Sequence, residues 1–196
     1  MTRKPEAERR AEIEAVAVRL LAETGPQGLS MLAVARAARA SNQTLYRWYG
    51  SKEGLFAALV QRQADLALSA LDAVQEDAGD DPLEGVLTRL GPVLLESVLA
   101  DTPVALTRAA VADPGGGLAE AVQARGRQAL VARLAAILDA AGVARPGVAA
   151  DLYLALLLGD AQMRRALGLL DMPGPEKALA RAAFAARAFL DLLERD

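Results

Sequence analysis

Residues 34–55 of the chain read VARAARASNQTLYRWYGSKEGL, and this stretch decides the fold. Ser41 belongs to the residue types that cap helix N-termini, and it precedes a short segment with helical apolar spacing. In that segment Leu45, Trp48 and Tyr49 can face inward, which leaves the neighbouring polar side chains nearer the outside. The stretch therefore predicts a short helix with one packed face and one polar face.

A second short helix is expected directly upstream. Ser30 is a good N-cap for it, and the helix should end near Arg39. One apolar stripe is formed by Met31, Val34, Ala35 and Ala38. A turn of about three residues then separates the two helices, which predicts a helix-turn-helix over about residues 30–50.

Longer helices are predicted on both sides. One over about residues 5–24 should end at Gly25-Pro26, and Ser51 caps another that should run to Gly79. Gly91-Pro92 is expected to kink or split the helix that follows. The remaining predicted helices lie near residues 83–100, 103–112, 117–141, 147–170 and 174–194. Because alanine and leucine dominate and aromatic residues make up only 4%, the fold class is all-α, with about nine helices in total.

The residue inventory excludes most enzyme chemistry. The chain has no histidine and no cysteine, so it cannot form a Ser/His/Asp triad, a thiolate nucleophile or the usual zinc and copper sites. We therefore predict no catalytic residue, no metal and no cofactor.

Nothing in the sequence predicts a membrane span or an export signal. The longest charge-free stretch, residues 24–35, is shorter than the roughly 20 apolar residues of a bilayer span. The N-terminus has no apolar signal region, and no cysteine is present to form a disulfide. We expect a cytoplasmic protein with no membrane partner.

Charge is divided unevenly along the chain. Residues 1–62 hold ten Lys/Arg against six Asp/Glu, a net charge of +4, whereas residues 63–196 hold twelve against nineteen, a net charge of -7. A basic head on an acidic body is the pattern expected if only the head meets phosphate.

The quoted stretch resembles the signature of the tetracycline-repressor (TetR) family. The likeness rests on Leu45-Tyr46, the aromatic Tyr49, and Ser51-Lys52-Glu53 leading to Leu55. It covers roughly the first third of the chain and implies a three-helix helix-turn-helix domain for DNA binding over residues 1–55. The same resemblance implies a helical effector-binding and dimerisation domain over residues 56–196, with some likeness to the AefR-like type.

Three positions depart from the family pattern. Arg39 stands where the turn usually has glycine, and Gln43 and Trp48 stand where glycine and histidine are common. The departures leave the expected fold intact, and they bear on turn geometry and on the operator sequence.

A helix that enters the major groove needs short polar or charged side chains near its N-terminal end to reach base edges. A cation at Lys52, in a first helical turn, opposes the helix dipole, and a bound phosphate would reverse that penalty. Arg3 and Lys4 form a basic arm or a mere tail. The expected DNA-binding residues are Arg3, Lys4, Ser30, Ser41, Asn42, Gln43, Thr44, Tyr46, Arg47, Trp48 and Lys52.

The last two predicted helices, 147–170 and 174–194, carry more apolar surface than one contact face needs. A homodimer through these helices is expected, and its two-fold axis would match a palindromic operator. The alternative is that they are core helices of a monomer. The resemblance further implies an unknown small-molecule effector, and polar candidates to line its pocket are Arg108, Gln123, Tyr153, Asp160 and Gln162, for which surface placement is equally open.

The leading functional hypothesis is a ligand-responsive repressor that binds double-stranded operator DNA as a homodimer. A helical protein-protein adaptor with a degenerate helix-turn-helix is the alternative, motivated by the substituted turn glycine and the acidic body. A small helical-bundle enzyme is a third reading, which the residue inventory disfavours. The sign of regulation, the effector and the operator are not contained in the sequence.

Overall fold

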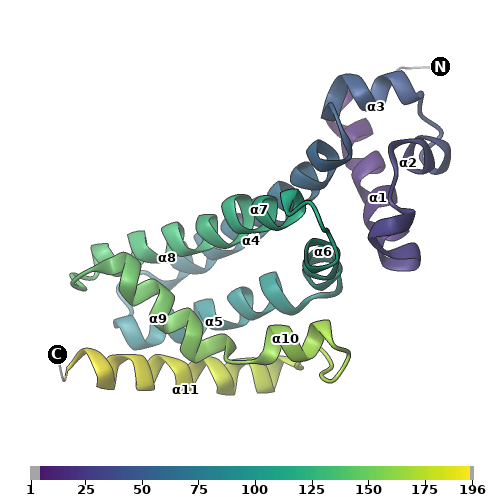
Figure 1. Cartoon of the computed structure of the whole chain (residues 1–196). Coiled ribbons are helices and arrows are strands. Elements are labelled where there is room, and N and C mark those ends of the chain that lie inside the picture. Colours follow the sequence, from purple (N-terminus) through teal and green to yellow (C-terminus); the bar gives the residue numbers. More distant parts are fainter. Residues whose placement is uncertain (1–4, 195–196) are drawn as a thin grey trace. The chain divides into compact units, whose positions relative to one another are not determined.

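The computed structural model describes residues 5–194, and these residues form helices joined by short turns, without any strand (Figure 1). The all-α prediction is thus confirmed. The elements are α1 (Glu6–Gly28), α2 (Met31–Ala37), α3 (Asn42–Tyr49), α4 (Lys52–Ala78), α5 (Leu83–Leu99), α6 (Asp101–Val111), α7 (Gly117–Ala121), the π-helical η1 (Val122–Arg127), α8 (Gln128–Ala140), α9 (Pro146–Leu158), α10 (Ala161–Ala166) and α11 (Pro175–Leu193).

The chain packs as two compact units. The head unit contains the residues up to Arg62 together with Ala105–Arg125, and the body unit contains Gln63–Val104 and the residues from Gly126 onward. The core of the head includes Leu106 and Leu118, because α6 and α7 return to pack there. A functional boundary at residue 55 remains a proposal, since packing alone assigns more of the chain to the head.

The head is built from locally encoded helix starts. Ser30 Oγ accepts a hydrogen bond from Ala33 N at 3.1 Å, and Ser41 Oγ accepts one from Thr44 N at 3.0 Å. The predicted caps of the two short helices are therefore confirmed, and Ser51 Oγ likewise accepts from Gly54 N at the start of α4. The backbone leaves helical geometry at Gly25, as predicted, although helical hydrogen bonding resumes up to Gly28.

The body unit is organised around α5 and α11, which lie side by side, with α8 and α9 completing the core (Figure 1). Gly91 of α5 lies directly against Ala182 of α11. The rings of Tyr153 and Phe189 meet edge to face with centroids 5.7 Å apart, and both are fully buried. Small residues at the helix contact and aromatic rings beside it allow close packing of helices.

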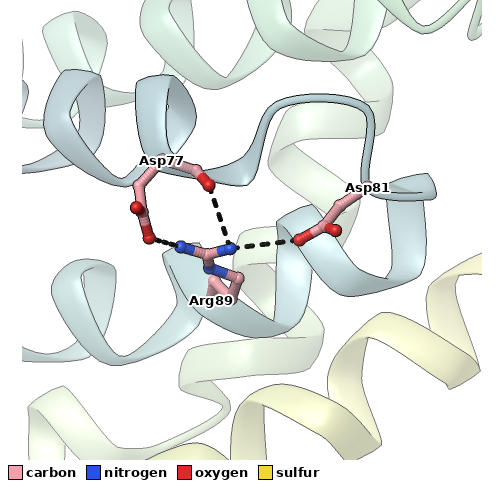
Figure 2. A network of polar contacts seen from close by, with 3 residues as sticks. All are labelled: Asp77, Asp81 and Arg89. Carbon is pink, nitrogen blue, oxygen red and sulfur yellow. Dashed lines mark hydrogen bonds and ion pairs between the residues drawn. The ribbon is translucent and has the colours of Figure 1, made fainter.

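The turn between α4 and α5 is closed by one arginine. The Arg89 guanidinium donates to Asp81 Oδ2 at 3.1 Å, to the Asp77 carbonyl at 3.4 Å and to the Asp77 carboxylate (Figure 2). The chain turns back at the predicted break, where Gly79 has a positive φ, and these contacts stabilise the turn within the body unit. All three side chains are at the surface, so this network orders the turn and adds little to stability.

One helix prediction was wrong. The predicted helix 147–170 is broken at Gly159 (φ 50°, ψ −125°) into α9 and α10. Arg181 of α11 donates from Nε to the Leu157 carbonyl at 2.9 Å and from Nη2 to the Leu156 carbonyl at 2.6 Å, which satisfies the open end of α9. A kink or a split was predicted at Gly91-Pro92, and the split is absent, because α5 continues from Leu83 to Leu99 with Pro92 inside it.

The predicted helix 117–141 is continuous in outline but changes type, with η1 lying between α7 and α8. As for membrane insertion, no individual helix within residues 5–194 is both long and apolar enough to cross a bilayer. Within these residues, α5 and α6 taken together have the length and apolar composition of a membrane span, but the pair is bent by 49°.

Candidate DNA-binding surface

Helix α3 exposes a polar stripe. Asn42, Gln43, Tyr46 and Arg47 are exposed, whereas Leu45 is fully buried on the opposite side. The predicted division of this helix into an inner and an outer face matches the structure. The outer face begins at the helix N-terminus, where short polar side chains can reach base edges in a groove.

The hydroxyl groups around the start of α3 are tied to one another. Ser41 Oγ and Thr44 Oγ1 lie 2.8 Å apart, and Thr44 is half-buried. Ser30 is exposed at the start of α2, where its oxygen accepts the cap hydrogen bond. A hydroxyl that accepts from a backbone N-H keeps its own proton, so Ser30 retains a donor for a phosphate oxygen.

Trp48 occupies a different position from the other expected contact residues. Its ring is half-buried, meets Tyr49 edge to face with centroids 6.5 Å apart, and lies under the Arg10 guanidinium at 5.2 Å. Trp48 therefore lies in the packing contact between α3 and α1.

Lys52 donates from Nζ to the Pro26 carbonyl at 2.7 Å. This bond links the first turn of α4 to the segment after the kink in α1, two segments that lie far apart in the sequence. A lysine ammonium has three donors, so two remain for a phosphate. The contact positions the charge at the start of α4, where the sequence predicted an anion site.

The turn between α2 and α3 keeps its geometry without glycine. Arg39 has φ 50°, a left-handed conformation, and Ala40 N donates to the Ala35 carbonyl at 2.9 Å while Arg39 N donates to Arg36 O at 3.2 Å. These two bonds form a Schellman motif, in which the left-handed position is usually glycine. The substitution therefore leaves the turn intact and strains one residue.

Arg9 supports this turn and was missed by sequence reasoning. Its Nη2 donates to the Ala38 carbonyl at 2.8 Å and to the Arg39 carbonyl at 2.9 Å, and its Nη1 pairs with Glu12 at 2.7 Å. The residues that it joins are 29 and 30 positions apart, so no local pattern could have revealed the contact.

We expect Arg39→Gly to raise the free energy of unfolding by about 0.5–1 kcal/mol, since a side chain in the left-handed region costs at least as much. Chemical denaturation followed by Trp48 emission measures the change. Arg39→Ala is the matched control, because it removes the guanidinium and keeps the strain. If alanine stabilises the protein as much as glycine does, the side-chain charge and not the backbone is the cause.

The first turn of α4 is also ordered by Glu53. Hydrogen bonds from its own backbone N-H and from Ser51 lower the pKa of the Glu53 carboxyl, and Lys52 acts in the same direction.

Among residues 5–194, no group of three or more acidic side chains is arranged to hold a metal ion.

The five expected effector-lining residues are divided between the two units. Arg108 and Gln123 belong to the head unit and are exposed, while the other three belong to the body unit. Tyr153 is fully buried and donates its hydroxyl to the Leu87 carbonyl at 2.7 Å, Asp160 is exposed before α10, and Gln162 is half-buried. Tyr153 is thus a core residue with a satisfied hydroxyl.

One open hollow in the body unit has a volume of about 560 Å³ and is lined by Asp72, Gln75, Glu76 and Arg133. Arg133 bridges it by pairing with Asp72 at 2.6 Å and hydrogen bonding to Gln75. None of the expected effector residues lines this hollow.

Arg3 and Lys4, which were expected to contact DNA, lie outside the described residues.

Comparison with known proteins assigns the chain. Residues 13–59 match the model of bacterial regulatory proteins of the tetR family, and residues 85–193 match the C-terminal domain of AefR-like transcriptional repressors. A search of curated proteins found no match.

Solved structures resemble the chain over nearly its whole length. A TetR transcriptional regulator from Agrobacterium tumefaciens is 28% identical, with a TM-score of 0.68 and 94% of both chains covered. The flavonoid-responsive regulator FrrA is 27% identical, with a TM-score of 0.68 and 95% of this chain and 97% of that chain covered. A TetR-family regulator from Mesorhizobium loti MAFF303099 shares the fold at 24% identity, with a TM-score of 0.81 and coverage of 97% and 98%.

TetR-family regulators are transcription factors and not enzymes. With an N-terminal helix-turn-helix whose exposed face is polar, and with more than half of its length matched by a regulator C-terminal domain, the chain belongs to the TetR family of bacterial DNA-binding transcriptional regulators.

Proposed function

We propose that this regulator is a ligand-responsive repressor that binds a palindromic operator as a homodimer in the cytoplasm. The observation that carries the proposal is the exposed stripe of Asn42, Gln43, Tyr46 and Arg47 on a helix whose other face is buried. A rigid helix face with polar side chains is what base readout in the major groove requires. Lys52 and Ser30, with donors left over, supply candidate phosphate contacts beside it.

The exposed apolar side chains of the body support a homodimer. Leu157 and Phe189 are buried in the core, but several other apolar side chains of the last two predicted helices are exposed. Among them are Leu152, Met163, Leu167 and Phe184, which are exposed by 36 to 63%. Large exposed apolar patches mark protein–protein interaction sites. A two-fold axis through this region would present two α3 helices to the half-sites of a palindrome.

The proposed effector is a small organic molecule. The similar regulator FrrA is flavonoid-responsive, which supports a small organic molecule as the class of signal for a body of this fold. To release DNA from about 99% to 1% occupancy, such a molecule must favour the released state by roughly 5.5 kcal/mol. Whether the bound protein represses or activates depends on operator position.

We expect specific, salt-sensitive binding to the duplex upstream of the protein's own gene, measured by fluorescence anisotropy against a scrambled duplex at two salt concentrations. Lys52→Gln should weaken binding to both duplexes and reduce the salt slope by about 1, since one phosphate contact is lost. Glutamine keeps an N-H donor for the Pro26 carbonyl. Lys177→Gln, an exposed lysine on α11, is the matched control and should change neither quantity.

Tyr46→Phe should weaken binding to every duplex, and Gln43→Ala should alter sequence preference by about 1–3 kcal/mol at one base pair. Two protomers per site would support the dimer. If none of Lys52→Gln, Tyr46→Phe and Gln43→Ala changes affinity, the assigned docking of α3 is wrong. Equal, weak binding to all duplexes from an unbiased site selection would favour the adaptor alternative.

A further inference from the structure

One buried carboxylate connects three helices of the head. Glu14 of α1 is only 9% exposed and is, within residues 5–194, the single charged residue in the buried class. Its neighbours along α1 are apolar core residues, Ile13 and Ala17. Burying a carboxylate without partners is costly, so its contacts require an explanation.

Glu14 has one partner on α3 and one on α4. Tyr49 donates its hydroxyl to Glu14 Oε1 at 3.2 Å, and Arg62 Nη1 lies 3.5 Å from Oε2. Burial and the negative charge of Glu14 raise the pKa of the Tyr49 phenol, which keeps the hydroxyl protonated and able to donate. The Arg62 side chain is 47% exposed, so its pairing partly neutralises the carboxylate without a large gain in stability.

The hydroxyl of Tyr49 is not needed to fill space. The ring itself packs in the head core, meets Trp48 edge to face, and has the Arg10 guanidinium 6.0 Å from its centroid. A phenylalanine would make the same ring contacts. The remaining contribution of the hydroxyl is its directional bond to Glu14.

Helix α3 has only eight residues, and an isolated helix of that length is unstable in water. Its position is therefore set by what its inner face contacts. The buried side chains of that face are Leu45 and Tyr49, and apolar packing of Leu45 has no preferred direction. The bond from Tyr49 to Glu14 is a directional hydrogen bond that links this inner face of α3 to α1.

We propose that Tyr49 and Glu14 are positioning residues for DNA recognition, which hold α3 in the orientation that binds the operator although both are buried away from it. This inference rests on the proposed use of α3 for base readout. When only a fraction of the free protein has the binding orientation, the apparent dissociation constant rises by the inverse of that fraction. Loss of a hydrogen bond of ordinary net strength then weakens operator binding by about three- to tenfold.

The decisive variant is the double replacement Tyr49→Phe with Glu14→Met, made in the full-length protein. Removing both partners and keeping the shape leaves no buried group unpaired, so thermal stability should be unchanged or higher. Operator affinity should nevertheless fall about three- to tenfold. A purely structural role predicts the opposite, with affinity following stability.

Two further variants complete the design. Glu14→Gln keeps an oxygen that accepts from Tyr49 and should retain most of the affinity, as a conservative rescue. Ile13→Val removes one methyl group from the same core, lowers stability, and should leave the affinity of the folded protein unchanged. Affinity is measured well below the melting temperature of each variant, so that unfolding does not contribute.

A second measurement does not depend on DNA. Trp48 is the only tryptophan of the chain and contacts both Tyr49 and Arg10, so its emission reports how α3 packs against α1. The double variant should shift the Trp48 emission and speed amide hydrogen exchange in α3, whereas Ile13→Val should do neither. If the wild-type protein binds no duplex, the proposed function is wrong, while the emission and exchange measurements still test the packing of α3. If emission and exchange match wild type, or affinity is unchanged in the double variant, the positioning role is overturned.

Discussion

Replacing Gly54 with alanine should lower the free energy of unfolding of the head by about 3 kcal/mol. The variant should therefore lose operator binding at a lower temperature than the wild type, because its head unfolds there. A Cβ at this position would lie 1.9 Å from the Tyr49 carbonyl oxygen and 3.1 Å from its carbon. Both are backbone atoms at the corner where α3 ends and α4 begins, so no side-chain rotation relieves the clash. Alanine favours a helix by about 1 kcal/mol over glycine, which is too little to offset it.

Gly117→Ala is the matched control in the same unit. A Cβ there would meet only Glu53 Cγ at 3.8 Å, an ordinary contact at the start of α7. Denaturation followed by Trp48 emission should therefore show a large loss for Gly54→Ala and a change below about 1 kcal/mol for Gly117→Ala. Equal stability of the two variants would mean that α4 does not approach the end of α3 as closely as described.

Gly91→Ala should destabilise the body unit by about 2–3 kcal/mol. Its Cβ would lie 2.2 Å from the Ala182 Cβ, 3.1 Å from the Ala182 Cα and 3.3 Å from the Tyr153 hydroxyl oxygen. Helices α5 and α11 would have to separate, which opens the core around Tyr153 and weakens its bond to the Leu87 carbonyl. Thermal unfolding followed by far-ultraviolet circular dichroism gives the measurement.

A glycine of the same helix provides the comparison. Gly85→Ala would place a Cβ 3.6 Å from the Asp81 Cβ, so it should stabilise α5 slightly through helix propensity. Combining Gly91→Ala with Ala182→Gly moves the methyl group from α11 to α5 and should recover part of the lost stability. Full additivity of the two changes would contradict direct contact between these positions.

The features that the sequence alone determined are those encoded over a few residues. Ser30, Ser41 and Ser51 predicted three helix starts because a cap hydrogen bond joins residues three apart. The outer face of α3 followed from helical periodicity, so most of the candidate DNA contacts could be named before the fold was known. Local signals failed where a break depended on a distant partner, as at Gly159, whose flanking carbonyls are satisfied by Arg181.

Only the tertiary structure decided how the site is supported. Lys52 meets Pro26, Arg9 meets the turn at Ala38, and Tyr49 meets Glu14, in each case across 26 or more residues. Tyr153 illustrates the same limit, since a polar residue among apolar ones suits a pocket wall or a satisfied core position equally well. Burial and partner geometry distinguish these roles, and both depend on which helices pack together, which local spacing does not encode.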